Sequence, residues 1–314
     1  MKLAMVFPGQ GSQSVGMLDR YAAHPTVRKT LEEAGTILGQ DLWQLAAEGP
    51  VEELNRTVNT QPLMLACDVA VYRAWKESGG AAPSMMAGHS LGEYAALVAA
   101  GALAFADALP LVRFRAQAMQ EAVPAGVGAM AAIMSKGMQN EQAGVVDACA
   151  EAAQGQVVEA VNFNAPGQIV IAGHREAVER AIESARARGA KRGVMLPVSA
   201  PFHSSLLKPA AARLRDYLGK VKVGVPSIPV LHNVDVRSAT DADAVRSALA
   251  QQAASPVRWI QTVEAFVAAG VTHIVECGPG QVLTGLCRRI APDLSVLPTN
   301  DENELDEALA STRG

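Results

Sequence analysis

Residues 85–92 have the sequence MMAGHSLG, and this stretch gives the first indication of both the fold and the site. The apolar residues 85–87 predict a short buried strand, and residues 91–99 (LGEYAALVA) predict a helix. Between them, GHSLG fits the G-x-S-x-G pattern, in which a sharp strand-to-helix turn holds a serine out of a sheet. Ser90 is therefore the candidate nucleophile. The alternative is a serine that only caps a helix, and the pentapeptide alone does not separate the two.

The elements around this turn predict an α/β fold. Short apolar strands at 3–7 and 272–275 alternate with helices at 27–38, 63–77 and 104–121. Short strands separated by helices are typical of a mainly parallel sheet with helices on both faces.

The middle of the chain breaks this alternation. This part predicts four strands and two helices in the order βαββαβ, which is the ferredoxin-like unit. The expected ranges are 129–134, 141–153, 157–161, 168–172, 176–188 and 192–196. We therefore expect an inserted small subdomain at 126–197 and a large subdomain formed by 1–125 and 198–314. The cleft beside the insert is the natural place for a site.

A nucleophilic serine needs a base, and the chain has six histidines. His203 lies in SAPFHS at residues 199–204, a turn before a helix where the chain re-enters the large subdomain. His232 and His273 lie at or in apolar strands and read as core residues. His203 is therefore the preferred base, with a loop histidine of no chemical role as the open alternative.

Two further features suit acyl-transfer chemistry. FPGQGSQ at residues 7–13 lacks the pattern of a phosphate loop, but its glycines would let the Gln10 N–H point inward as an oxyanion donor beside the Leu91 N–H. A plain tight turn is the alternative. Arg113 and Arg115 lie in the helix at 104–121, where an arginine normally faces solvent. If one faces the cleft, its guanidinium would bind a carboxylate with two hydrogen bonds.

Composition excludes several classes of function. The 314 residues carry a net charge of −4, which gives no general attraction to nucleic acid or to an anionic membrane. Four scattered cysteines form no CxxC pair, so we expect free thiols and no metal site. The apolar run at 3–7 is too short for a signal-peptide core, and we expect a cytoplasmic protein that acts as a monomer.

These motifs occur together, in this order, in one family. The sequence resembles the malonyl-CoA:acyl-carrier-protein transacylases of bacterial type II fatty acid synthesis over essentially its whole length. The shared features are FPGQGSQ at 7–13, QP at 61–62, GHSLGEY at 88–94, Arg115, VNFN at 161–164, PFHS at 201–204 and GPG at 278–280.

The resemblance implies a role for each candidate residue. Ser90 would attack the thioester and become malonylated, and His203 would act as general base and then general acid. The backbone N–H groups of Gln10 and Leu91 would form the oxyanion hole. Arg115, rather than Arg113, would bind the malonyl carboxylate.

The family pattern also implies that a backbone carbonyl steadies the histidine, and Gln252 matches that position. It implies a hydrolase-like α/β core, a ping-pong reaction with malonyl-CoA and acyl carrier protein as partners, and no metal or other cofactor. A free-standing polyketide acyltransferase stays open as an alternative. So do a serine hydrolase using His273 and a non-enzymatic scaffold that binds carrier protein.

Carrier proteins are acidic, so a basic docking patch is expected near the cleft mouth. A cluster on the insert is one candidate, and a pair near the C-terminus is its rival. The cluster consists of Arg186, Arg188, Lys191 and Arg192, and the pair of Arg288 and Arg289.

Overall fold

The computed structural model describes residues 1–313 and centres on a five-stranded parallel sheet. Its strand order is β7-β2-β1-β8-β9, and every residue of β1 is buried. A strand buried on both faces reads as a continuous apolar run, which is why LAMVF shows no alternation. The strands are β1 (Leu3–Phe7), β2 (Met85–Gly88), β7 (Val230–Leu231), β8 (His273–Glu276) and β9 (Ser295–Pro298).

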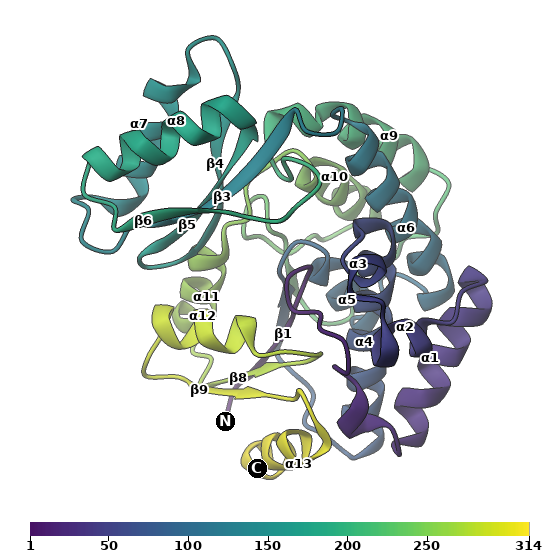
Figure 1. The fold of residues 1–314 in the computed structure, drawn as a ribbon. Helices are drawn as coiled ribbons and strands as arrows, with labels where there is room; N and C mark the ends of the chain where they lie inside the picture. Colours follow the sequence, from purple (N-terminus) through teal and green to yellow (C-terminus); the bar gives the residue numbers. More distant parts are fainter. Residues whose placement is uncertain (314) are drawn as a thin grey trace.

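Helices lie on both sides of this sheet (Figure 1). The N-terminal helices gather on one side, and α11 and α12 lie toward the other, whereas the buried residues of α13 belong to the same apolar cluster as those of the N-terminal helices. The helices of this part are α1 (Pro25–Leu38), α2 (Leu42–Glu48), α3 (Val51–Leu54), α4 (Thr57–Glu77), α5 (Gly92–Ala99), α6 (Phe105–Glu121), α9 (Lys208–Leu218), α10 (Ala242–Gln252), α11 (Trp259–Ala268), α12 (Val282–Ile290) and α13 (Glu302–Thr312). Two short 3-10 turns, η1 (Asp19–Tyr21) and η2 (Ser205–Leu207), complete it.

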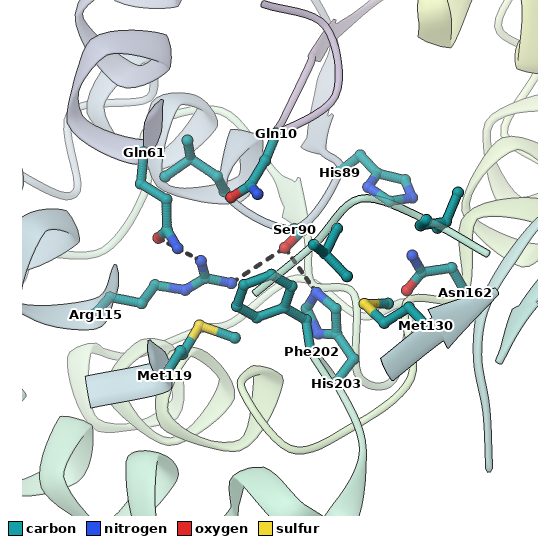
Figure 2. A pocket seen from close by; sticks show the side chains of 13 residues that line it. Gln10, Gln61, His89, Ser90, Arg115, Met119, Met130, Asn162, Phe202 and His203 are labelled. Atoms are coloured by element: carbon teal, nitrogen blue, oxygen red, sulfur yellow. Dashed lines mark hydrogen bonds between the residues drawn. The ribbon is translucent and has the colours of Figure 1, made fainter. Parts of the chain in front are cut away.

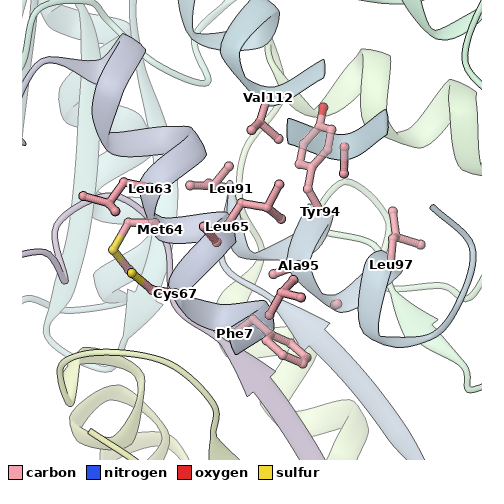
Figure 3. Packing of buried hydrophobic residues seen from close by; sticks show 14 of the residues in the cluster. Phe7, Leu63, Met64, Leu65, Cys67, Leu91, Tyr94, Ala95, Leu97 and Val112 are labelled. Carbon is pink, nitrogen blue, oxygen red and sulfur yellow. The ribbon is translucent and has the colours of Figure 1, made fainter. Parts of the chain in front are cut away.

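A tightly packed apolar cluster fixes the helix that follows the candidate nucleophile (Figure 3). Leu91 and Tyr94 at the start of α5 pack with Leu65 of α4, Phe7 of β1 and Val112 of α6. All five side chains are at most 1% exposed. Burying one such side chain contributes about 1.5–3 kcal/mol, so this packing holds the start of α5 in one position relative to the sheet.

The middle of the chain forms a second, separate sheet. Its four antiparallel strands have the order β4-β5-β3-β6, and α7 and α8 cover one face (Figure 1). The elements are β3 (Gly128–Met134), α7 (Glu141–Ala153), β4 (Val158–Ala165), β5 (Gln168–His174), α8 (Arg175–Ala187) and β6 (Arg192–Met195). The expected fold class, a parallel α/β core with a βαββαβ insert, is confirmed.

The insert also has a core of its own. The apolar faces of α7 and α8 pack on β3, β4 and β5 and form a cluster distinct from those of the parallel sheet. A separate core is the mark of a unit that folds around itself. We therefore propose the division into a small subdomain at 126–197 and a large one made of 1–125 and 198–314.

Candidate active site

The candidate nucleophile lies on a strained turn between β2 and α5. Ser90 has a φ of 53°, a conformation that costs a residue with a side chain about 1–3 kcal/mol. Asn233 holds the turn from behind, because its Oδ1 accepts the Ser90 N–H at 2.8 Å and its Nδ2 donates to the Gly88 carbonyl at 2.7 Å. The strain persists because the surrounding hydrogen bonds compensate for it.

Gly88 and Gly92, which flank this turn, must be glycines because backbone atoms lie too close to leave room for a side chain. A Cβ on Gly88 would lie 1.9 Å from the carbonyl carbon of Gly92, and one on Gly92 would lie 2.0 Å from the Phe7 carbonyl oxygen. Neither contact can be relieved by moving a side chain, since the neighbours are backbone atoms. The G-x-S-x-G pattern thus reflects how closely the end of β2 packs on the start of α5, and the start of α5 on the end of β1.

His203 is the histidine that reaches Ser90. Its Nε2 lies 2.7 Å from Ser90 Oγ (Figure 2). Its Nδ1 lies 2.9 Å from the backbone carbonyl oxygen of Gln252. A carbonyl can only accept, so Nδ1 carries the proton and Nε2 is left free to accept from the serine. His203 itself has a φ of 66° in the loop before η2, so its backbone is as constrained as that of Ser90.

The environment keeps this imidazole neutral. His203 is 3% exposed, and burial together with the adjacent Arg115 guanidinium lowers its pKa to about 3. Both causes disfavour the imidazolium, and the hydrogen bond to Gln252 only partly opposes them. The ring is therefore in the base form throughout the physiological range.

Arg115 faces the site and Arg113 does not. Arg115 is 1% exposed, and its Nη2 donates to Ser90 Oγ at 3.1 Å (Figure 2). Arg113 lies toward the opposite side of α6, where it donates to the Leu38 carbonyl and to Gln40. The choice of Arg115 over Arg113, implied by the family pattern, therefore agrees with the geometry.

Two backbone N–H groups border the same space. Leu91 precedes α5 and Gln10 follows β1, and both residues line the pocket that contains Ser90. Within residues 1–313, neither N–H has a hydrogen-bond acceptor. Unpaired amides at a helix N-terminus and in a neighbouring loop are the donors that an oxyanion requires.

The pocket around Ser90 is small and its lining is largely apolar. Its volume is about 110 Å³, and it lies between the parallel sheet and the insert. Polar side chains, among them Arg115 and His203, reach toward Ser90, and apolar side chains make up the rest of the lining (Figure 2). These apolar side chains include Met119, Met130, Leu196, Val198 and Phe202. A space of this size suits a short acyl group.

The remaining histidines near the sheet do not reach Ser90. His273 begins β8 and pairs with Leu3 at the start of β1, whereas Ser90 follows the end of β2. His232 is buried and hydrogen-bonds Glu93. His89 turns toward Asn164, 2.8 Å away. A hydrolase triad built on His273 is therefore excluded by the position of that residue in the sheet.

Sequence reasoning missed three residues that support the site. Gln61 binds Arg115, Asn233 holds the nucleophile turn, and Glu93 accepts hydrogen bonds from the Asn233 N–H and from Gln252. Gln61 and Glu93 belong to the motifs QP and GHSLGEY, but the residues that they bind lie far away along the chain. Only the folded structure brings them together.

The described residues contain neither a metal-ligand cluster nor a membrane-spanning helix. Within residues 1–313, no three His, Cys, Asp or Glu side chains gather where a metal could bind. Over the same range, no helix has both the length and the apolar character needed to cross a membrane. All four cysteines are buried and unpaired with one another.

Comparison with known proteins places this site in a family. A protein from Escherichia coli K12 named malonyl CoA-acyl carrier protein transacylase is 54% identical over 309 residues, covering 98% of this chain and 99% of its own length. A crystal structure of an acyl-carrier-protein S-malonyltransferase from Burkholderia pseudomallei 1710b is 59% identical, with a TM-score of 0.95 over 99% of this chain and 100% of that one.

A third relative was solved together with its partner. It is a malonyl-transacylase in complex with a type II polyketide acyl-carrier protein, 52% identical with a TM-score of 0.96 over 99% of this chain and 100% of that one. The acyl transferase domain family matches residues 4–296. The motifs of the chain, its fold and these relatives all indicate the same family. The chain belongs to the acyl transferase domain family.

Proposed function

We propose that this enzyme transfers the malonyl group of malonyl-CoA to the phosphopantetheine thiol of acyl carrier protein through a malonyl-Ser90 ester. The observation that carries the proposal is the contact of Ser90 Oγ with both His203 at 2.7 Å and Arg115 at 3.1 Å. The first contact suits a nucleophile with its base, and the second suits an acyl group that ends in a carboxylate. The relatives named above act on the same substrates, as their names state.

The first half-reaction follows from the protonation state of His203. Ser90 Oγ attacks the thioester carbon while its proton passes to the neutral Nε2 of His203. The Gln10 and Leu91 N–H groups stabilise the resulting oxyanion. Collapse of this intermediate breaks the C–S bond, the imidazolium returns its proton to the CoA sulfur, and the malonyl group stays on Ser90.

The second half-reaction reverses these steps with a new thiol. The carrier's thiol gives its proton to His203 and attacks the Ser90 ester, and the oxyanion forms in the same hole. Collapse then breaks the ester C–O bond, and His203 returns the proton to Ser90 Oγ. Every proton is returned within a half-reaction, no atom changes oxidation state, and the N–H groups stabilise the oxyanion, so this scheme uses no metal or redox cofactor.

The structure and the relatives weigh against two of the alternatives and leave one open. A non-catalytic scaffold would not need a strained serine beside a neutral histidine. A hydrolase would need a bound water in place of the thiol and gains nothing from Arg115. The pathway stays open, since the E. coli transacylase and the transacylase that partners a type II polyketide carrier protein are about equally similar to this chain, at 54% and 52% identity. We propose fatty acid biosynthesis, a cytoplasmic location and a monomer.

Transfer and hydrolysis are distinguished by one measurement. When the full chain, malonyl-CoA and holo-acyl carrier protein are mixed, intact-mass analysis should show malonyl accumulating on the carrier. Free malonate should form at least about 100-fold more slowly, since a small pocket with a largely apolar lining gives a water nucleophile little support. Malonate release at a rate close to that of transfer would contradict the proposal and favour a hydrolase.

The groove leading away from Ser90 supports a carrier-docking site near Arg289 rather than on the insert. A second hollow shares Gln10, His89, Asn162 and Leu196 with the Ser90 pocket, and it continues along α12 to Gln168. Arg289 lies at that end, where its Nη1 donates to Gln168 at 2.7 Å. On the insert, Arg186 and Arg188 each form an ion pair with a glutamate, which partly neutralises them.

Charge reversal at Arg289 should therefore weaken carrier docking more than reversal on the insert. We expect Arg289→Glu to raise the KM for holo-acyl carrier protein about 5- to 10-fold. An exposed charge at the rim of an interface acts mainly on the rate at which the two proteins associate. Arg188→Glu is the matched control, exposed and basic but paired with Glu151 at 3.0 Å. The same rise in both variants, or in Arg188→Glu alone, would return the docking site to the insert.

A further inference from the structure

The guanidinium of Arg115 is held by neutral side-chain oxygens. Its Nη1 donates to Gln61 Oε1 at 2.6 Å and its Nη2 donates to Gln252 Oε1 at 2.8 Å. Both glutamines are buried, at 2% and 0% exposed. Within the described chain, Arg115 forms no ion pair with a carboxylate. A fully buried guanidinium thus has two amide partners and no counter-charge in contact.

This arrangement leaves the positive charge only partly compensated. Amide oxygens supply hydrogen bonds but no net charge, so the guanidinium keeps its attraction for an anion. Burial lowers the pKa of Arg115 from its ordinary value, a sign that the charged form lacks full compensation. An arginine is the cation best able to stay charged in such a place.

Within residues 1–313, Glu93 is the carboxylate that acts on Arg115, and the Gln252 side chain lies between the two. Gln252 Nε2 donates to Glu93 Oε2 at 2.9 Å while its Oε1 accepts from Arg115. Glu93 also accepts from His232 Nδ1 at 2.7 Å and from the Asn233 N–H at 2.9 Å. Glu93 is therefore committed to other donors, and the Gln252 amide is fixed with its oxygen toward Arg115.

The orientation of Gln61 is fixed in the same way. Its Nε2 donates to Thr57 Oγ1 at 3.0 Å, and Thr57 Oγ1 donates to Gln10 Oε1 at 2.8 Å. The donor end of the Gln61 amide is thus occupied, which leaves its oxygen for Arg115. Both glutamines present an acceptor of fixed direction and no charge.

We propose that Gln61 and Gln252 are specificity-determining residues, whose neutral amides hold Arg115 in place while reserving its charge for the carboxylate of the incoming acyl group. They select acyl thioesters with a free acid end over neutral ones such as acetyl. This inference rests on the proposed role of Arg115 in binding the malonyl carboxylate. Gln61 and Gln252 are positioning residues in this scheme, since they act through Arg115.

A single isosteric change tests the proposal. Gln61→Glu would place a carboxylate against Arg115 and neutralise the guanidinium charge within the protein. We expect the ratio of kcat/KM for malonyl-CoA to that for acetyl-CoA to fall on the order of 100-fold, the scale of a buried charge pair. Gln61→Met, which has similar length but neither charge nor acceptor, should lower the same ratio less than about 10-fold.

The ratio separates this role from a structural one. A disturbance of the oxyanion loop through Thr57 and Gln10 would slow both thioesters together and leave the ratio unchanged. A ratio that is unchanged in Gln61→Glu, with cooperative thermal unfolding retained, would overturn the proposal. If Gln61→Glu fails to fold, Gln252→Met decides the question, because it keeps the backbone carbonyl that His203 uses. It should lower the ratio about 10-fold, and an unchanged ratio would overturn the proposal.

Arg115→Met distinguishes a failure here from a failure of the proposed function. If Arg115→Met lowers the ratio and the Gln61→Glu variant does not, the glutamines have no part in specificity but Arg115 keeps its role. If Arg115→Met also leaves the ratio unchanged, Arg115 does not bind the acyl carboxylate and both proposals fail.

Discussion

Replacing Ser90 with alanine should abolish the covalent intermediate and lower malonyl transfer by a factor of about 10⁴ or more, as is typical for loss of a nucleophile. The reason is that, among residues 1–313, Ser90 carries the hydroxyl that meets both His203 and Arg115, and no other hydroxyl side chain lines that pocket. Intact mass after incubation with malonyl-CoA should show the malonyl adduct on the wild-type chain and none on Ser90→Ala.

The small loss of volume makes this variant a clean test. Alanine removes only the hydroxyl, and the strained turn stays held by Asn233 through the backbone of residues 88 and 90. Ser199→Ala is the matched control, an exposed serine four residues before His203. It should keep the adduct. A full-yield adduct on Ser90→Ala would show that another residue carries the acyl group.

The nucleophile turn could be predicted because its causes are local. A strand, two glycines and a helix start are adjacent in sequence, and the close approach of Gly88 and Gly92 to backbone explains why glycine stands there. The βαββαβ order of the insert was likewise readable from consecutive elements. Short-range patterns determine such features, so the sequence alone sufficed.

Two elements show where local patterns were incomplete. The strand predicted at 157–161 continues to Ala165 as β4, because irregularities between Ala160 and Asn162 and between Phe163 and Ala165 disrupt the two-residue alternation. Helix α13 was missed, although Asp301 accepts the Glu304 N–H in the manner of a helix-capping residue.

The hydrogen-bond network behind the site could not be predicted. Gln252 bonds Ser90, Glu93 and Arg115, residues that lie 137 to 162 positions away in the chain. An amide side chain has one end that donates and one that accepts, and no spacing in the sequence reveals which partner each end meets in the folded chain. The backbone contact of Gln252 with His203 was expected from the family pattern, whereas its side-chain contacts emerged only from the structure.

Replacing His203 with alanine should lower the rate of malonyl transfer about 10³- to 10⁴-fold, near the upper end for loss of a general base. Ser90 would keep Arg115 and the oxyanion donors but would have no acceptor for its proton. Single-turnover acylation with malonyl-CoA measures this step directly. His89→Ala is the control, since His89 lines the pocket but turns toward Asn164. An equal loss in both variants would contradict the assignment of His203 as base.

The pH profile gives the same assignment an independent test. Since the pKa of His203 is lowered to about 3, the imidazole is unprotonated and active above that value, and protonation inactivates it only in stronger acid. The rate of acylation should therefore show no fall between pH 8 and 5, where an ordinary histidine with a pKa near 6.5 would lose its base form. In Arg115→Met the positive charge beside His203 is absent, so the pKa of His203 should rise. The loss of rate in acid should then begin at a higher pH than in the wild-type enzyme. An inflection near pH 6.5 in the wild-type enzyme would mean that the imidazole is hydrated and that burial does not control its protonation.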